Sequence, residues 1–296
     1  MRKKSDVRNE KELTEQEINC IIHDYFESFL TIRELGRKYK LTVRALPLIL
    51  KNNGIDTHRK NRYTLNDAYF HEIDTEEKAY WLGFLYADGY VGNEKFNNII
   101  FSQKKSDANT VIQFAKDINY SGKLREANPG SHAFENSQPQ IVCNFSSKKM
   151  ATDLRKLNLY PNKSLTMSDM PSIDKKFIRH FVRGYFDGDG SIHEHIRSYY
   201  KNHVYKQYVV SIIGTVPFLT KIQEILPVKS VLHDSHTPEM KYLQVVKNES
   251  IISLYCYFYK DATRFLQRKK DIFIKAVGYN HEKPWFEKWD KLIKGV

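Results

Sequence analysis

The chain has 296 residues, and 47 Lys and Arg against 35 Asp and Glu give a net charge of 47 − 35 = +12 at neutral pH. About two domains fit this length, and 41 % hydrophobic with 13 % aromatic residues can form folded cores, which excludes a wholly disordered chain. Such a basic composition is typical of a protein that binds nucleic acid or an anionic membrane surface, or of one whose charges are simply solvated at the surface.

Membrane insertion and secretion are not expected. The longest apolar run, 251–259, is much shorter than the roughly 18 residues of a membrane span, and no basic amphipathic helix with a broad apolar face is evident. The basic N-terminus lacks the apolar stretch of a secretory signal. We therefore expect a cytoplasmic protein of bacterial or phage type, or an organellar one. Three widely spaced cysteines predict buried thiols rather than disulfides or zinc ligands: Cys20, Cys143 and Cys256.

Residues 1–60 predict a small all-α unit with three short helices. Apolar residues recur on one helical face of 31–40, Thr42 can cap the third helix, and Asn53-Gly54 ends it. The segment resembles a helix-turn-helix unit, whose second helix enters the major groove of DNA. The resemblance implies that the residues facing DNA are Thr42, Arg44, Ala45, Lys51 and Asn52.

Pro47 departs from this helix-turn-helix pattern, because a proline inside a helix removes a backbone donor and is expected to kink it. The other interpretation of residues 1–60 is a three-helix cap that packs on the next domain without touching DNA. Residues 61–72 are polar and aperiodic, so we expect a linker there.

Beyond the linker the sequence contains two copies of one motif. The first is AYWLGFLYADGYV at 79–91 and the second is HFVRGYFDGDGSI at 180–192, with their Asp-Gly pairs 189 − 88 = 101 residues apart. We therefore divide the rest of the chain into a first repeat, 73–170, a second repeat, 171–275, and a C-terminal extension, 276–296.

Each motif predicts an apolar helix that ends at its Asp-Gly pair. Small residues lie four apart in both copies, Gly83 with Ala87 and Gly184 with Gly188. Such residues form a groove in which two helix backbones can approach closely, so the two motif helices are expected to pack on each other through these faces.

The ends of the motif helices carry capping signals. Asp74 with Glu77 has the spacing of a capping box at the first helix, and Ser172 can cap the second helix. Gly89 and Gly190 stand where a helix C-terminus favours a left-handed residue.

Two aspartates define the predicted chemical centre. If the motif helices pack through their small faces, Asp88 and Asp189 meet at two helix C-termini, where the macrodipole is already negative. Neutralising that charge calls for hard cations, and Mg²⁺ suits a partly hydrated oxygen site best, with Mn²⁺ able to substitute. We assign the adjoining Gly89 and Gly190 to the same metal site. Magnesium under a phosphodiester can stabilise the attacking and leaving oxygens of hydrolysis.

These two segments resemble the LAGLIDADG motif, and residues 66–275 are similar to a single-chain, two-repeat LAGLIDADG homing endonuclease. The resemblance implies that the motif helices form a pseudo-twofold interface and that Asp88 and Asp189, each before the last glycine of its motif, bind the catalytic metal. The earlier acid of the family motif is present as Asp187, whereas Tyr86 replaces it in the first copy.

The segments after each motif repeat one order of elements. The first has a strand ending IIFSQKK, a helix TVIQFAKDI, strands around KLREA and QIVCNF, and a helix over 147–157. The second has SIHEHIR, YKQYVVSIIGT, a helix VPFLTKIQEIL, strands KSVLHD and KYLQVV, and a helix through LYCYFYKDATRFL. The sequence thus predicts an α+β fold of two αββαββα repeats preceded by the all-α unit. The resemblance implies antiparallel sheets that form a saddle over DNA, with alternate strand positions reading bases.

Two lysines occupy matching places after the last helix of each repeat. Lys163 and Lys269 are 269 − 163 = 106 residues apart, and Lys270 is an alternative to Lys269 by one register step. The resemblance implies that both border the metal site, where they polarise water or stabilise phosphate charge. It also places Gln103 near the attacking water, whereas the second repeat has Gly214 there. The other interpretation of the lysines is a solvated surface.

Charge is uneven along the chain, because residues 1–70 carry +4, residues 71–170 balance to zero and residues 171–296 carry +8. We therefore expect the stronger salt-sensitive phosphate contact from the second repeat. The candidate DNA contacts within the repeats are Lys104, Lys105, Lys201, Lys206 and Gln207.

A His-Glu-His run in the second repeat could suggest a metal site. In a strand, however, Glu194 points away from His193 and His195, and no further ligand is evident. We expect these side chains to be exposed or to face DNA.

The leading hypothesis is a monomeric, metal-dependent endonuclease that cuts both strands of double-stranded DNA across the minor groove of a long asymmetric target. Two alternatives use the same scaffold: a regulator that binds DNA without cutting it, and a maturase that binds intron RNA. For Asp88 and Asp189, the structural alternative is a pair of helix-terminal turn residues. Protein splicing is not expected, since the chain begins with Met1 and ends KLIKGV.

Overall fold

The computed structural model describes residues 13–27, 30, 32–42, 44–55, 63–128, 138–199 and 203–281. The chain divides into two compact units, Met1–Leu65 with Asn119–Lys123, and Asn66–Ile118 with Leu124–Val296. No helix in the described ranges is both long and apolar enough to cross a membrane.

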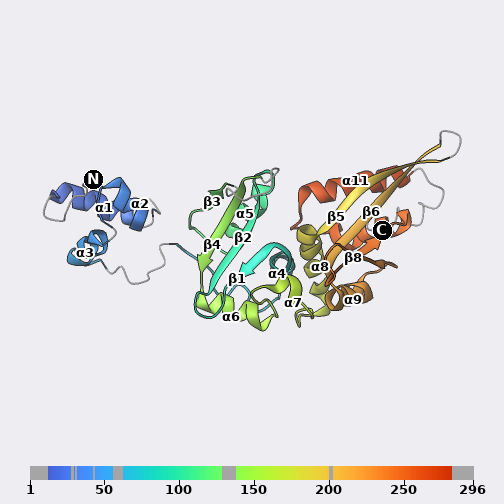
Figure 1. Cartoon of the computed structure of the whole chain (residues 1–296), viewed down its shortest axis with the longest axis horizontal. Coiled ribbons are helices and arrows are strands. Elements are labelled where there is room, and N and C mark those ends of the chain that lie inside the picture. Colours follow the sequence, from blue (N-terminus) through green and yellow to red (C-terminus); the bar gives the residue numbers. More distant parts are fainter. Residues whose placement is uncertain are drawn as a thin grey trace. The chain divides into compact units, whose positions relative to one another are not determined.

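The first unit is built from the helices α1 (Glu15–Glu27), α2 (Ile32–Lys38) and α3 (Ala45–Asn52), as Figure 1 shows. Its core consists of apolar side chains that recur at helical spacing, so burial of one face of each helix holds the unit together. The buried residues are Ile21, Tyr25, Leu35, Leu41, Leu46, Ile49 and Leu50.

The third helix begins later than the sequence suggested, and this removes the difficulty at Pro47. Because α3 begins at Ala45, Pro47 lies in its first turn, where a backbone N–H has no partner within the helix. The predicted kink is therefore not required. Arg44 rather than the predicted Thr42 occupies the N-cap position, although the Thr42 hydroxyl accepts a hydrogen bond of 2.9 Å from the N–H of Ala45, the first residue of the helix.

The second unit contains the two predicted αββαββα repeats (Figure 1). The first repeat consists of α4 (Glu76–Asp88), β1 (Gly89–Val91), β2 (Asn98–Lys104), the 3₁₀ turn η2 (Lys105–Asp107), α5 (Ala108–Asp117), β3 (Arg125–Ala127), β4 (Gln140–Ser146) and α6 (Lys148–Lys156). The second consists of α8 (Lys175–Asp189), β5 (Gly190–Tyr199), β6 (His203–Thr215), α9 (Val216–Ile225), β7 (Val231–Asp234), β8 (Met240–Val245) and α10 (Asn248–Tyr259). The short α7 (Lys163–Thr166) joins the repeats.

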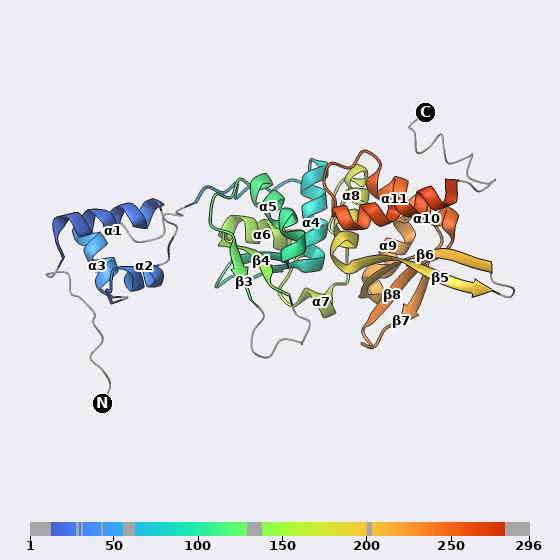
Figure 2. The same ribbon diagram turned by 90° about the horizontal axis from the view of Figure 1, so that it is seen from above.

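The strands form two four-stranded antiparallel sheets with matching orders, β1-β2-β4-β3 and β5-β6-β8-β7. Seen from above in Figure 2, the helices α4, α5, α8, α10 and α11 lie on one side of this unit and the sheets on the other. Alternate strand positions such as Phe101, Ile212 and Leu243 are buried beneath the helices, whereas Tyr90 and Lys104 are exposed on the opposite face. That pattern confirms the predicted fold class.

Three details of the elements differ from the sequence prediction. Thr75 and Asp174 cap α4 and α8 in place of the predicted residues, by accepting from the N–H groups of Lys78 and Lys176. Of the cysteines, Cys143 and Cys256 are buried as predicted, whereas Cys20 is exposed.

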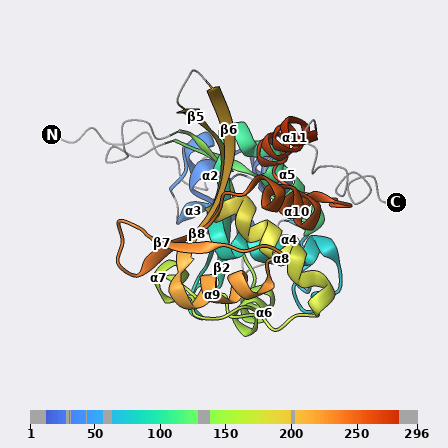
Figure 3. The same cartoon turned by 90° about the vertical axis from the view of Figure 1, so that its right-hand side faces the viewer.

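The last predicted helix, over 254–266, ends earlier than predicted. Helix α10 ends at Tyr259, the chain turns at Asp261, whose φ is 60°, and α11 (Gln267–His281) follows as a separate helix beside α10 (Figures 2 and 3). Helix propensity continues the predicted helix through residues 260–266, but a left-handed residue cannot continue an α-helix. The predicted boundary at residue 275 lies within α11.

The motif helices pack through the small residues, as predicted. A Cβ atom added to Gly83 would lie 1.9 Å from the Phe181 carbonyl oxygen, and one added to Gly184 would lie 2.0 Å from the Tyr80 carbonyl oxygen. Both positions are therefore closed to any side chain. Since α4 and α8 come from different repeats, this contact joins the two halves of the unit.

We predict that Gly83→Ala lowers the free energy of unfolding by about 3 kcal/mol or more, because the added methyl group forces the two backbones apart. The matched control is Gly278→Ala in α11, where a Cβ meets nothing within 4 Å among the described residues. We expect that change to be neutral or to stabilise by up to about 1 kcal/mol. Urea denaturation followed by circular dichroism measures both. Wild-type stability in Gly83→Ala would contradict this close packing.

Candidate active site

Asp88 and Asp189 are the last residues of α4 and α8, so helix packing brings the two carboxylates together. A Cβ added to Gly188 would lie 2.2 Å from the Ala87 Cβ and 3.2 Å from Asp88 Oδ2, which shows how closely the helix ends approach. Asp88 is exposed and Asp189 is partly buried. The predicted meeting of two acids at two helix C-termini is confirmed.

Gly89 and Gly190 do not adopt the predicted left-handed conformation. Their backbones are extended, with φ −83° and ψ 156° at Gly89 and φ −97° and ψ 166° at Gly190, because each helix runs directly into a strand. Glycine is needed for close approach instead. A Cβ would lie 2.7 Å from the Leu85 carbonyl oxygen at the first site and 2.5 Å from the Phe186 carbonyl oxygen at the second.

The electrostatics of the two carboxylates reflect this crowding. Desolvation, reinforced by the charge of Asp88, raises the pKa of Asp189 to about 6, against the opposing attraction of Lys163. Desolvation also raises the pKa of Asp88, although its outer edge reaches solvent. The Gln103 amide opposes that shift by donating a 2.7 Å hydrogen bond to Asp88 Oδ2. The structure thus places Gln103 beside Asp88. Its position near an attacking water stays a prediction.

Lys163 lies at the C-terminal end of α4. Its Nζ donates to the carbonyl oxygens of Ala87, at 3.1 Å, and Gly89, at 2.6 Å. Its ammonium charge therefore compensates the negative end of the first motif helix. Burial lowers the pKa of this ammonium, whereas the charges of Asp189 and Asp88 raise it.

Lys269 does the same for α8, and more completely. It is only 2 % exposed, and its Nζ donates to the carbonyl oxygens of Phe186, Asp187, Gly188 and Gly190 at 2.6, 2.7, 3.4 and 2.5 Å. Burial lowers its pKa to about 8, although the nearby carboxylate of Asp187 opposes this.

This geometry selects between the two candidate lysines of the second repeat. Lys269 binds the end of the motif helix, whereas the Nζ of Lys270 lies 3.7 Å from the centre of the Phe265 ring. The sequence alone could not distinguish Lys269 from Lys270, because both lysines lie in one QRKK run.

Asp187 is a buried acid that the sequence placed in the motif without assigning it a role. It accepts hydrogen bonds from the hydroxyls of Tyr80 and Tyr259 and from the Leu266 N–H, at 2.9, 2.9 and 2.7 Å. Leu266 directly precedes α11, so Asp187 links both motif helices to the helix that carries Lys269. Burial raises the pKa of Asp187. At the corresponding position of the first repeat, Tyr86 donates to the Leu157 carbonyl oxygen.

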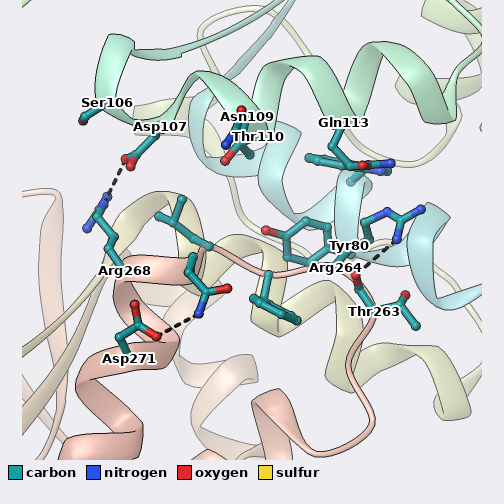
Figure 4. A pocket seen from close by; sticks show the side chains of 14 residues that line it. Tyr80, Ser106, Asp107, Asn109, Thr110, Gln113, Thr263, Arg264, Arg268 and Asp271 are labelled. Atoms are coloured by element: carbon teal, nitrogen blue, oxygen red, sulfur yellow. Dashed lines mark hydrogen bonds and ion pairs between the residues drawn. The ribbon is translucent and has the colours of Figure 1, made fainter.

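Arg268 is a cation near the site that the sequence prediction missed. Its guanidinium donates a 2.9 Å hydrogen bond to Asp107, and its positive charge opposes the rise in the pKa of Asp88. Its position directly before Lys269 was the available signal. Arg268 also lines a pocket of about 570 Å³ between α5 and the segment leading into α11 (Figure 4). Around the pocket, Arg268 with Asp107 and Arg264 with Asp117 tie the two repeats together.

The donor set at Asp88 and Asp189 fits a hard divalent cation. Two carboxylates lie at the ends of two helix dipoles, and both lysines direct their N–H groups at backbone carbonyls rather than at carboxylate oxygens. Oxygen ligands that leave room for water are those that Mg²⁺ prefers. The carbonyl oxygens of Gly89 and Gly190 already accept from lysine, so the carboxylates are the better ligands. No group of three or more His, Cys, Asp and Glu suited to a metal occurs in the described ranges.

The predicted DNA contacts lie at different places on the sheets. Lys104 is exposed at the end of β2, and Lys105 donates to Glu126 at 3.0 Å. Lys206 Nζ lies 2.9 Å from Glu194 Oε1, and the Gln207 amide donates to the Val246 carbonyl oxygen at 3.2 Å. Lys201 lies outside the described residues. In the first unit, Lys51 is exposed on α3, and Thr42 and Arg44 are exposed in the segment directly before it.

The chain resembles solved LAGLIDADG homing endonucleases. These include I-LtrWI bound to target DNA, 12 % identical over 78 % of this chain and 98 % of the other, with a TM-score of 0.49. The meganuclease I-SmaMI bound to uncleavable DNA is 13 % identical, covering 74 % and 97 %, with a TM-score of 0.46. I-AabMI bound to uncleaved DNA is 10 % identical, covering 73 % and 98 %, with a TM-score of 0.49.

No protein-family model matches the sequence. Among curated proteins, the replication factor C small subunit of Methanocaldococcus jannaschii is 27 % identical in an alignment of 210 residues that covers 64 % of this chain. The chain spans only 10 % of the length of that protein.

We predict that Asp189→Asn stabilises the protein at pH 7 without divalent cations. A carboxyl whose folded pKa is about 6, above its ordinary 3.8, binds its proton more tightly when folded. Its ionisation therefore costs stability as pH rises from about 4 to about 6, and the full cost remains above that range. Because Asp189 is partly exposed, we expect a gain of about 1 to 2 kcal/mol.

Urea denaturation in EDTA at pH 7 and at pH 4 measures this effect. The difference between wild type and Asp189→Asn should shrink at pH 4, where the wild-type carboxyl is protonated in the folded state. Added Mg²⁺ should stabilise wild type more than the variant. A variant that is less stable than wild type at pH 7 in EDTA would contradict the raised pKa of Asp189.

Proposed function

We propose that this chain is a LAGLIDADG-type homing endonuclease, which hydrolyses both strands of double-stranded DNA at one long, asymmetric site. One observation carries the proposal: two matched motif helices, packed through glycines, bring Asp88 and Asp189 together at their C-terminal ends. Turn formation alone gives no reason to place two acids where two helix dipoles are negative. Metal-dependent cleavage of a phosphodiester gives such a reason, because the two acids can hold the metal.

The side chains around the carboxylates have distinct roles in this proposal. Asp88 and Asp189 hold divalent cations, of which Mg²⁺ is the first choice and Mn²⁺ a substitute. Lys163 and Lys269 hold the ends of the motif helices in place through the carbonyls that they bind. Gln103 orients Asp88 through its amide. The bound cation supplies charge stabilisation for the attacking and leaving oxygens of the phosphodiester.

The exposed faces of the two sheets form the proposed DNA interface. Both sheets lie on the side of the unit away from the covering helices (Figure 2), and their strands alternate between buried and exposed positions. The net charge of +12 favours a polyanion. Since one chain supplies both aspartates, we propose that it acts as a monomer. The two strands are then cut across the minor groove, one by each half of the site.

We predict that Asp88→Asn and Asp189→Asn each reduce double-strand cleavage by at least about a hundredfold, because each substitution removes a charged ligand of the cation. Binding to the same DNA in Ca²⁺ should change by less than about tenfold. The measurement is cleavage of a plasmid that carries the candidate target. For a homing endonuclease this target is the DNA on the two sides of its gene, joined as it would be without the insertion. Conversion of supercoiled plasmid to nicked and linear forms separates cutting of one strand from cutting of both.

Asp174→Asn is the matched control, since it changes an aspartate at the opposite end of α8, where the side chain caps the helix. It should cut like wild type. Full cutting by both active-site variants would overturn the assignment. Tight binding by wild type with no cutting under any divalent cation would favour a non-cleaving regulator, and preferential binding of intron RNA would favour a maturase.

We also propose that the first unit contacts DNA through α3. Arg44, Leu48, Lys51 and Asn52 recur at helical spacing and are all exposed, with Leu48 at 52 %. Cations beside one exposed apolar residue suit phosphates and a thymine methyl group in the major groove. The plain structural cap remains the competing interpretation of this unit.

We predict that the double variant Arg44→Ala, Lys51→Ala makes the dependence of log K on log[salt] less steep. The magnitude of the negative slope should fall by about 1 to 2, because each phosphate contact releases about one counterion. The control is Arg37→Ala with Lys40→Ala, which removes the same charge from α2 and the turn after it. Fluorescence anisotropy over a salt series gives the slopes. Equal slopes for wild type and the α3 variant would favour the structural cap.

A further inference from the structure

Asp187 is a buried acid in α8 to which the proposed chemistry gives no role. It is 1 % exposed and lies close to Asp189, at the end of the helix. Its Oδ1 accepts a hydrogen bond of 2.9 Å from the Tyr259 hydroxyl, and its Oδ2 accepts one of 2.9 Å from the Tyr80 hydroxyl. Burying a carboxyl group is costly unless it is hydrogen-bonded, so its partners indicate what it holds in place.

The third hydrogen bond of this carboxylate reaches the chain that enters α11. Asp187 Oδ2 accepts from the Leu266 N–H at 2.7 Å, and the Asp187 carbonyl oxygen accepts from Lys269 Nζ at 2.7 Å. The two partners are 269 − 266 = 3 residues apart, about one helical turn, and the Lys269 N–H bonds to the Leu266 carbonyl oxygen. Asp187 therefore contacts the first turn of α11 at both ends, through its side chain at Leu266 and through its backbone at Lys269.

Other contacts hold this segment on the unit without help from Asp187. Arg264 donates to the two carboxylate oxygens of Asp117 at 2.6 and 2.9 Å. Arg268 donates to Asp107 at 2.9 Å (Figure 4). Loss of the Asp187 carboxylate should therefore leave α11 docked, and it should change the position of the turn that carries the lysine.

The first repeat has no acid at this position. Tyr86 occupies it, and its hydroxyl donates to the carbonyl oxygen of Leu157, which is 163 − 157 = 6 residues before Lys163. Lys163 is partly exposed and donates to the carbonyl oxygens of Ala87 and Gly89. Lys269, in contrast, is 2 % exposed. The two lysines are therefore supported in different ways.

We propose that Asp187 is a positioning residue, which places the Lys269 ammonium at the end of α8 by holding the first turn of α11. The inference rests on the proposed function and adds to it an unequal dependence of the two halves of the site. The half built on Lys269 needs Asp187, whereas the half built on Lys163 does not. Asp187 itself touches neither DNA nor metal in this proposal, because both of its carboxylate oxygens are engaged inside the protein.

Two substitutions of Asp187 separate its hydrogen bond from its charge. Asp187→Ala removes the acceptor for the Leu266 N–H, so we expect double-strand cleavage to fall by about ten- to a hundredfold through misplacement of Lys269. Asp187→Asn keeps a carbonyl oxygen for that N–H, and the Tyr259 hydroxyl can rotate to accept from the new amide. It should therefore cut within about threefold of wild type. A loss as large as that of Asp187→Ala would contradict the role of this hydrogen bond.

Tyr259→Phe is the matched control for stability. It removes another hydrogen bond to the same carboxylate and leaves the one from Leu266 intact. Its midpoint of urea denaturation should fall, as that of Asp187→Ala does, yet it should cut both strands at the wild-type rate, measured on DNA labelled on each strand. An equal loss of cutting in Tyr259→Phe would show that Asp187 acts through stability alone and would overturn the proposal.

A double-mutant cycle tests whether Asp187 acts through Lys269. Asp187→Ala combined with Lys269→Met should cut no more slowly than Lys269→Met alone, because the lysine that it positions is already gone. Combined with Lys163→Met, which acts in the other half of the site, its effect should multiply. Asp187→Ala should also slow the two strands in the same proportion as Lys269→Met. A multiplied loss with Lys269→Met would overturn the proposal.

A measurement that needs no activity separates this inference from the proposed function. Acetylation of the full chain with acetic anhydride, followed by mass spectrometry, compares the reactivity of Lys269 with that of the exposed Lys275 in the same helix. Lys269 should become at least about tenfold more reactive in Asp187→Ala, and it should stay protected in Asp187→Asn and Tyr259→Phe. If wild type never cuts DNA but Lys269 shows this change, the positioning holds and the endonuclease assignment fails. If wild type cuts and Lys269 stays protected in Asp187→Ala, the positioning is wrong.

Discussion

The close approach of α4 and α8 is the contact on which the rest of this molecule depends. Gly83 and Gly184 let each helix backbone meet the carbonyl oxygens of the other, and no larger residue fits at either position. This contact holds the motif helices together and brings Asp88 close to Asp189. The stability of the unit and the arrangement of the two carboxylates therefore depend on the same residues, so a substitution that changes one changes the other. The ion pairs of Arg264 with Asp117 and of Arg268 with Asp107 also join the two repeats.

The site that results is electrostatically unfavourable and partly compensated by the chain itself. Two acids and two helix C-termini crowd together. Burial raises the pKa of both carboxyls, and the charge of Asp88 adds to the rise at Asp189. Lys163 and Lys269 offset the helix ends by binding carbonyl oxygens, and they leave the carboxylates short of cations. A bound divalent cation would complete that compensation. In the proposed function, the same imbalance that costs stability without metal would favour binding of the cation.

Sequence patterns predicted the features that depend on local spacing. The Asp-Gly pairs 101 residues apart, the small residues four apart and the order of strands and helices are all periodic, and the fold and the central acids followed from them. Features that depend on tertiary contacts did not follow. The extended backbone of Gly89, the turn at Asp261 and the capping of α8 by Lys269 are each set by what packs nearby, which a local pattern does not contain.

The two repeats are alike at their junction and different away from it. At the junction, matched glycines, aspartates and lysines must meet, so the repeats have the same arrangement there. Even so, Asp187 joins α8 to the start of α11, whereas Tyr86 has only a backbone partner. Farther out, the β5–β6 hairpin is longer than β1–β2 by seven pairs (10 − 3). A symmetric centre with unequal arms suits an enzyme that cuts two equivalent strands within a target whose two halves differ in sequence.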